Sequence, residues 1–178
     1  LDDGTAQGWL LQGFEALNAT WPHPQHVLVN RALMATGPSG FSGCLGKFVP
    51  ERADVVLLGF ADMCRRPTDV DDHNALTNST FGRDLERIVR ALAARSDPPT
   101  LVFWNFFKWN DFSCSKCSWR QTCEGELHEL AAMYGASTIS LRNAFYTLGT
   151  TAHGGSKRSR FNYLAWTQDN GGHLSPSL

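Results

Sequence analysis

The strongest constraint on the fold is a regular alternation of apolar runs and amphipathic segments between residues 53 and 141. Ala53–Phe60 and Thr100–Phe107 are continuously apolar and predict strands, and Ser137–Leu141 predicts another. Apolar residues recur at helical spacing in Arg83–Arg95 and Gln121–Tyr134, which predicts two helices. Strands that alternate with helices through short links predict an α/β fold, a parallel sheet with right-handed crossovers under helices.

Further elements are expected before this region. Thr5–Ala19 shows helical spacing, His26–Asn30 is a short β-branched run that predicts a strand, and Phe41–Phe48 predicts a brief helix. Ala53–Phe60 is apolar throughout rather than alternating, so both of its faces are expected to be covered. Functional groups in such sheets gather at the carboxyl ends of the strands, which here include the loop Ala32–Gly40.

Composition limits the classes of function. The chain has 178 residues, 42% of them hydrophobic, and a formal net charge of −1. This length suits a single domain spanning 1–178. The charge gives no attraction to nucleic acid, and no apolar run reaches the ~18 residues that a membrane span needs.

The cysteines admit two interpretations. Cys114, Cys117 and Cys123 cluster in one polar segment and, with His128, could form a zinc site. The spacing differs from that of known zinc modules, so a local disulfide is favoured, with one thiol free or joined to Cys44 or Cys64. We therefore predict no metal and no cofactor.

Two sequons, Asn18-Ala19-Thr20 and Asn78-Ser79-Thr80, could accept glycans in a secreted chain. They favour the secretory pathway only weakly, because such triplets also arise by chance. The sequence leaves both the compartment and the oligomeric state open.

Several short runs follow one another in a recognisable order: Val29–Gly37, Cys44-Leu45, Val49-Pro50, Ala53–Ala61, Leu85–Arg90 and finally His173-Leu174-Ser175. Together they resemble the SGNH hydrolases, the GDSL esterase/lipase superfamily, and among these the plant and algal members. The resemblance covers most of Gly8–Leu178. It implies a three-layer flavodoxin-like sandwich with a parallel sheet.

The resemblance also implies a chemistry. In that superfamily a serine attacks an ester or acetyl carbonyl, a histidine acts as base, and an aspartate orients the histidine. The serine backbone, a glycine and an asparagine form the oxyanion hole, and each such donor is worth about 10²–10³ in rate.

The superfamily's residues match this chain only in part. Gly37 matches the oxyanion glycine, although a tight turn is an equal explanation, and His173 matches the base. The aspartate usually lies three residues before the histidine, where this chain has Asn170, with Asp169 one residue further back. Met63 stands where the oxyanion asparagine is expected, and a thioether donates no hydrogen bond.

The serine motif, Gly-Asp-Ser after a first strand, has no counterpart in Leu1–Thr5. We therefore expect the first, central strand to be missing from this chain, a natural polypeptide that begins further upstream, and truncation at both ends. Ser39 and Ser42 are possible substitute nucleophiles but are better explained as turn or cap residues. This chain alone is expected to be inactive.

The sequence therefore predicts a serine esterase or O-acetyl hydrolase with an incomplete catalytic set. His173, Asp169 and Gly37 are its site residues, and its substrate is a small ester or an acetylated glycan. The alternative is a non-catalytic relative that keeps the fold as a carbohydrate-binding or interaction module. Met63 and Asn170 favour that alternative.

Overall fold

The computed structural model describes residues 9–33, 36–61, 64, 79–105, 123–141, 143–144, 167–168 and 173–174. The chain divides into two compact parts. One consists of Leu1–Ala32 and Asn162–Leu178, and the other is Leu33–Phe161.

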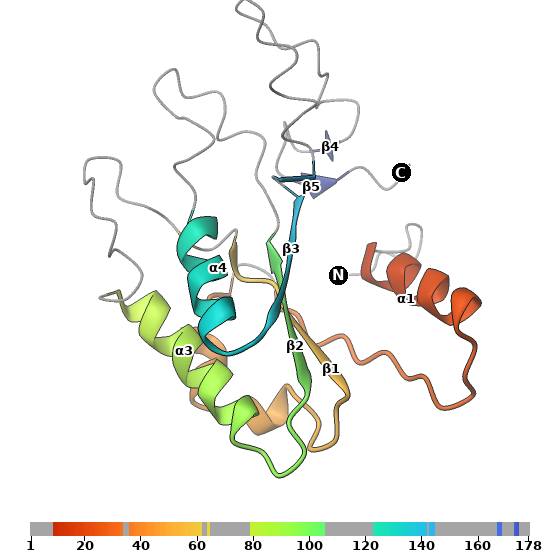
Figure 1. Ribbon diagram of the computed structural model, residues 1–178, viewed down its shortest axis with the longest axis horizontal. Helices are drawn as coiled ribbons and strands as arrows, with labels where there is room; N and C mark the ends of the chain where they lie inside the picture. Colours follow the sequence, from red (N-terminus) through yellow and green to blue (C-terminus); the bar gives the residue numbers. More distant parts are fainter. Residues whose placement is uncertain are drawn as a thin grey trace, which may run out of the picture. The chain divides into compact units, whose positions relative to one another are not determined.

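The larger part, Leu33–Phe161, contains a parallel sheet (Figure 1). Its strands β1 (Val55–Leu58), β2 (Thr100–Asn105) and β3 (Ser137–Ser140) lie in the order β1-β2-β3. Helix α3 (Thr80–Ala93) connects β1 to β2, and helix α4 (Glu124–Met133) connects β2 to β3. The predicted alternation of helices with a parallel sheet is confirmed, and each strand is shorter than its apolar run.

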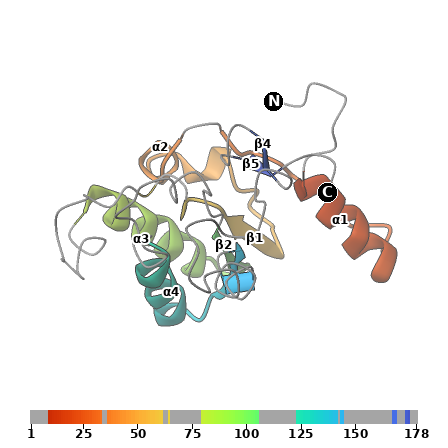
Figure 2. The same cartoon turned by 90° about the horizontal axis from the view of Figure 1, so that it is seen from above.

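Both connecting helices cover the same face of the sheet (Figures 1 and 2). Sequential strand order produces this arrangement, because two right-handed crossovers made in the same direction place their helices on one side. Alternate strand residues point to this face, and they form the core with apolar residues of the helices. The buried set includes Leu58, Leu101, Phe103, Leu85, Ile88, Val89, Leu92, Leu127 and Ala131.

The opposite face of the sheet is apolar and exposed. Val55 is 56% exposed, Leu57 41% and Ile139 42%. Leu57 pairs with Val102 and Ile139 with Trp104, so these side chains form one continuous strip across the three strands. The expectation that both faces of β1 are covered is therefore wrong for this strand, because the two crossover helices lie together on the other face.

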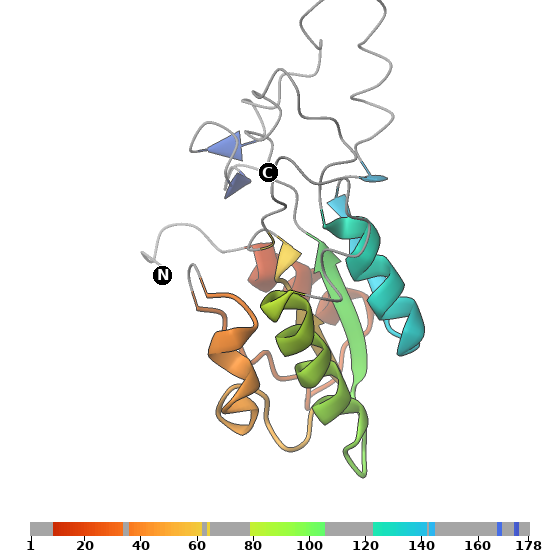
Figure 3. The same ribbon diagram turned by 90° about the vertical axis from the view of Figure 1, so that its left-hand side faces the viewer.

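The helix expected over Phe41–Phe48 is instead two short turns. Helix α2 (Ser39–Ser42) ends at Gly43, and a 3₁₀ turn, η1 (Leu45–Lys47), follows. Helix α2 packs beside α3 (Figure 3). At the other end of α3, the Arg95 guanidinium donates to the carbonyl oxygens of Val49 and Pro50, 3.3 Å and 2.7 Å away. Residues 38–50 are thus attached to α3 at both ends.

The smaller part contains helix α1 (Trp9–Thr20) and two short strands. The strand predicted at His26–Asn30 is wrong: this segment has no regular secondary structure, it pairs with none of the described strands, and Val27 and Val29 are exposed. Local side-chain bonds organise it instead. The Asn18 carbonyl oxygen, for example, lies 2.9 Å from His26 Nδ1. A strand requires a hydrogen-bonding neighbour, and the apolar pattern alone does not supply one.

The Gly-rich tail contains an antiparallel strand pair that the sequence did not predict. Strand β4 (Thr167–Gln168) pairs with β5 (His173–Leu174). His173 lies opposite Gln168 in this pair. Its backbone therefore belongs to a hairpin-like element rather than to an irregular tail.

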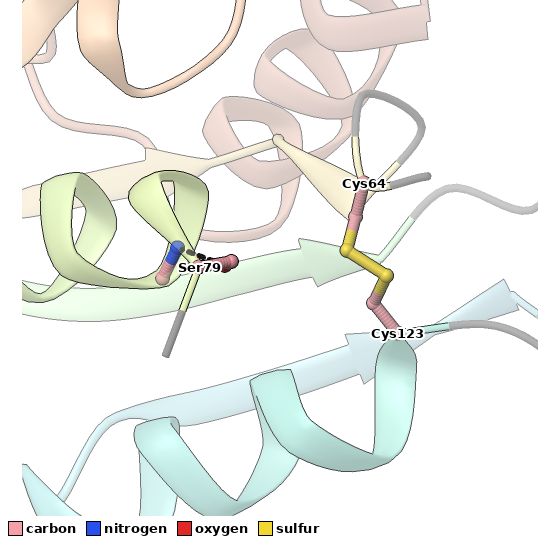
Figure 4. The surroundings of a disulfide bond; sticks show 4 residues. Cys64, Ser79 and Cys123 are labelled. Atoms are coloured by element: carbon pink, nitrogen blue, oxygen red, sulfur yellow. Dashed lines mark hydrogen bonds between the residues drawn. A yellow bond between two sulfur atoms is a disulfide. The ribbon is translucent and has the colours of Figure 1, made fainter. Parts of the chain in front are cut away.

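A disulfide joins Cys64, which follows β1, to Cys123, which immediately precedes α4 (Figure 4). Cys44 is a free thiol. Of the pairings that the sequence left open, the structure therefore shows Cys123 bonded to Cys64. Cys114 and Cys117 lie outside the described residues. The two cysteines are 59 residues apart in the sequence. The bridge therefore connects the segment after β1 to the start of α4.

Removal of this bridge tests its contribution to stability. We expect the double variant Cys64→Ala/Cys123→Ala to lose about 2–4 kcal/mol in free energy of unfolding, because a long loop regains its freedom in the unfolded chain. Urea denaturation followed by circular dichroism measures this loss. The matched control is Cys44→Ala, which removes a thiol that is not bridged and should cost less than ~1 kcal/mol. Equal stability of both variants would contradict the assignment.

Candidate functional site

The carboxyl edge of the sheet is where a parallel α/β fold places its ligand sites. β1 ends at Leu58 and is followed by Gly59 and Phe60, and β2 ends at Asn105. The Cys64–Cys123 bridge lies at this edge, beside the arrowhead of β2 and the start of α4 (Figure 4). The edge is therefore held by a covalent link between neighbouring connections.

Gly37 precedes α2, a helix that contacts the segment after β1. The ring of Phe41, four residues later, contacts the ring of Phe60 at a centroid distance of 5.4 Å, and Phe60 follows β1. The Gly37 carbonyl accepts a hydrogen bond from the Gly40 N–H at 3.1 Å. Within the described part of the chain, no hydrogen bond uses the Gly37 N–H. The expected oxyanion donor is therefore available.

Gly37 begins a turn, because its carbonyl accepts from the Gly40 N–H, but this turn does not need a glycine at its first position. Gly135 is the only described glycine with a positive φ, and a Cβ atom on Gly37 would have no neighbour within 4 Å. Neither the backbone conformation nor the packing therefore requires glycine here. The space beside the Gly37 backbone is open.

His173 is placed in β5, opposite Gln168. Asp169 and Asn170 lie between the two strands, outside the described residues, and so does Met63. Gly37 belongs to the larger compact part and His173 to the smaller. The expected convergence of the Gly37 loop and His173 on one edge stays a prediction.

The sequence did not single out Asn105, the last residue of β2. It is 1% exposed, and its Nδ2 has no hydrogen-bond partner among the described residues. The sequence feature that could have identified Asn105 is that it is the single amide side chain near the end of the apolar run Thr100–Phe107. Because the surrounding aromatic residues dominate that run, the sequence suggested core packing alone.

Glu124 is the other buried polar residue at this end of the sheet, and it is 3% exposed. It is the first residue of α4, so its carboxylate lies where the helix dipole favours negative charge. This position gives Glu124 a structural explanation. Leu127 and Ala131, further along α4, pack in the core.

Ser42 and Ser39, the possible substitute nucleophiles, both lie in α2. The Ser42 hydroxyl donates to the Asp84 carboxylate at 3.4 Å, and Arg87 donates to the same oxygen at 2.7 Å. Asp84 is buried between them. This arrangement braces α2 against α3 and gives Ser42 a structural role.

Two of the four possible zinc ligands, Cys114 and Cys117, lie outside the described residues. Cys123 is in a disulfide and cannot act as a thiolate ligand, and His128 is exposed on α4. In the ranges that the structure describes, no three acidic, histidine or cysteine side chains are grouped as a metal site.

A hollow of about 230 Å³ on the outer face of α3 is lined by Arg83, Glu86, Arg87 and Arg90. Most of its charge is already paired. Arg87 bonds to Asp84, and Arg90 donates to Glu86 at 2.8 Å and to the Tyr134 hydroxyl at 2.7 Å. The hydrogen bond from Tyr134 to Glu86, aided by the charge of Arg90, lowers the pKa of Glu86 below its usual value. We interpret this group as a link between α3 and the end of α4.

The Glu86 network predicts a pH-dependent effect of Tyr134→Phe. The pKa of Glu86 is lowered in the folded chain, so its stabilising effect is present above the unfolded value of about 4.5 and is lost as pH falls through the folded value. The variant should therefore be about 0.5–1.5 kcal/mol less stable than the wild type at pH 7. That difference should shrink at pH 3. Urea midpoints at both pH values measure it, and a constant difference would contradict the link.

Two neighbouring glycines allow a paired test of the open space at Gly37. Gly37→Ala should leave the melting temperature unchanged or slightly higher, because the added methyl group meets no atom and the unfolded chain loses freedom. At Gly40 a Cβ atom would lie 2.5 Å from the Thr36 methyl group, so Gly40→Ala should destabilise the chain by about 1–3 kcal/mol. Thermal unfolding compares them. A larger loss for Gly37→Ala would show that its surroundings are filled.

No family model, no curated protein and no solved structure matches this chain. Among the helices that the structure describes, none is long and apolar enough to cross a membrane. The described part of the chain has a mixed α/β architecture, in which the strands of a three-stranded parallel sheet alternate with helices.

Proposed function

We propose that this protein is a serine esterase or O-acetyl hydrolase of the SGNH type, whose substrate is a small ester or an acetylated glycan. His173 is the general base, Asp169 orients it, and the Gly37 N–H is one oxyanion donor. The full three-layer sandwich of that superfamily is part of the same proposal. The resemblance in the sequence supports the roles of His173 and Asp169.

The single observation that favours this function most is the state of Gly37. Its N–H makes no hydrogen bond to the described residues, and open space lies beside its backbone. Its loop contacts the carboxyl end of β1 through Phe41 and Phe60. An oxyanion donor needs all three properties: a free N–H, room for the acyl group and a place at the ligand-binding edge.

Each residue has one role in the proposed chemistry. A serine oxygen attacks the acyl carbonyl while the His173 imidazole takes its proton, and the carbonyl oxygen becomes an oxyanion. The Gly37 N–H stabilises that oxygen. The same imidazole then gives the proton to the alcohol oxygen as its bond to the acyl carbon breaks, and a water molecule, activated by that imidazole, releases the acyl group from the serine. Asp169 holds the imidazole in the productive tautomer and stabilises the positive charge that the imidazole takes on.

The second candidate function is a non-catalytic carbohydrate-binding or interaction module. Met63, at the position of the expected oxyanion asparagine, is the observation that favours it. Under this alternative the edge near Gly37 binds an acylated ligand and leaves its ester bond intact.

The disulfide suggests where the protein works. Stable bridges such as Cys64–Cys123 form in oxidising compartments. The sequon at Asn78 adds little, because such triplets also arise by chance. Ser79, its middle residue, caps α3: the Ser79 hydroxyl accepts from the Gly82 N–H at 2.9 Å. We propose maturation in the secretory pathway on the strength of the disulfide.

Hydrolysis of p-nitrophenyl acetate by the natural full-length polypeptide tests the function. We expect His173→Ala to abolish turnover above background, and Asp169→Asn to lower kcat by about 10⁴ because the wrong tautomer is favoured. The neighbouring Asn170→Ala should change kcat little. This pair identifies which of the two residues orients the base.

His128→Ala is the matched control, because His128 is an exposed histidine on α4 with no part in the proposed chemistry. Its turnover should equal that of the wild type. If His173→Ala and His128→Ala retain equal turnover, the esterase proposal fails. Binding of an acetylated glycan without turnover would favour the module instead.

A further inference from the structure

Asn105 is an unusual residue for the interior of this fold. Its neighbours on the same face of β2, Leu101 and Phe103, are apolar core residues. Asn105 is 1% exposed, and its Nδ2 has no acceptor within the described ranges of the chain. Asn105 is thus the last residue of the central strand, and its buried side-chain N–H groups have no acceptor among the described residues.

Such a donor is costly. A buried N–H group without an acceptor loses its hydrogen bonds to water and costs about 1–3 kcal/mol. Folded proteins tolerate few of these groups, and an unsatisfied one calls for an explanation such as a catalytic or ligand-binding role. Leucine has the same branching and the same number of side-chain heavy atoms, and it carries no donor that needs an acceptor. Stability therefore does not explain an asparagine at position 105.

The location gives the explanation. Asn105 lies at the carboxyl end of the central strand, where parallel sheets bind ligands. The Cys64–Cys123 bridge links the segment after β1 to the start of α4 at the same edge of the sheet. A donor that is fixed and shielded from water interacts more strongly with a developing negative charge than one that water surrounds.

Continuation of the register places Phe60 opposite Asn105, because Leu58 pairs with Phe103. Asn105 therefore lies one strand away from the chain that follows β1, which is the segment where Met63 replaces the expected oxyanion asparagine. Adjacent strands are ~4.8 Å apart, within reach of one side chain. An amide donor that is absent after β1 can therefore be supplied by Asn105 at the end of β2.

We propose that the side-chain amide of Asn105 is a ligand donor, which hydrogen-bonds the acyl carbonyl or carboxylate oxygen of a molecule bound at the carboxyl edge of the sheet. The inference rests on the proposed function for the identity of the ligand, an acyl group. It assigns the donor role that Met63 cannot fill to a residue on the neighbouring strand. In the module alternative the same amide anchors an acetyl group.

Nuclear magnetic resonance of the ¹⁵N-labelled chain tests the proposal without relying on catalysis. The probe is sodium acetate, added at constant ionic strength against sodium chloride. The side-chain amide signals of Asn105 are identified by their loss in Asn105→Leu. We expect these signals to shift saturably with acetate, and the same shift to remain in Thr100→Ala, a control at the opposite end of β2.

Thermal unfolding of Asn105→Leu provides the second readout. If the amide is reserved for a ligand, the variant should melt at the wild-type temperature or above it, because leucine removes an unsatisfied donor. A drop of several degrees, or failure to fold, would show that the amide has a structural acceptor and would overturn the proposal. Absence of any acetate-dependent shift would overturn it as well.

Turnover separates this proposal from the proposed function. In an active full-length protein, Asn105→Leu should lower kcat by about 10²–10³, the effect of one oxyanion donor, and Thr100→Ala should not. An inactive wild type that still shows the acetate shift would refute the esterase and support the Asn105 site. An active wild type with unchanged kcat in Asn105→Leu would refute the Asn105 site and leave the esterase standing.

Discussion

Burial of one face of the sheet under α3 and α4 is the constraint on which the rest of the larger part depends. Leu58, Leu101 and Phe103 alternate along β1 and β2 toward that face, and the helices add Leu85, Ile88, Val89, Leu92 and Leu127. The helices connect parallel strands, so burying this face also brings every strand end of one direction to the same edge. Hydrophobic packing thereby assembles a polar edge from segments that are distant in the sequence.

Specific contacts hold the two ends of this helix layer. The Cys64–Cys123 bridge links the connections at the carboxyl end, and Arg95 fixes residues 49–50 to the far end of α3. Ser42 and Arg87 meet at the buried Asp84 between these ends. The Gly37 N–H and the Asn105 amide, the two donors that we propose, therefore belong to a part of the chain that these contacts support.

The sequence predicted the strands and helices that a repeated pattern of apolar residues determines. The apolar runs located β1 and β2, and the spacing of Leu85, Ile88 and Leu92 located α3, because a single chemical period governs each element. The sequence-based predictions were wrong or incomplete for features that depend on strand pairing or on contacts between residues distant in the sequence. Val27 and Val29 have strand propensity but pair with none of the described strands, and His173 is paired through only two residues of β5. The link from Cys123 to Cys64 and the burial of Asn105 depend on tertiary structure, and no local pattern encodes them.

The two compact parts would contribute different steps to the proposed reaction. Gly37 and Asn105 both belong to Leu33–Phe161, and the proposals use only their hydrogen-bond donors, one from the backbone and one from a side chain. Donors can bind and polarise a carbonyl, but they accept no proton. The proposed base, His173, belongs to the other part. Under the proposal, acyl recognition and proton transfer are therefore assigned to different parts of the chain. Loss of the base alone would then turn the proposed esterase into the alternative, an acyl-binding module.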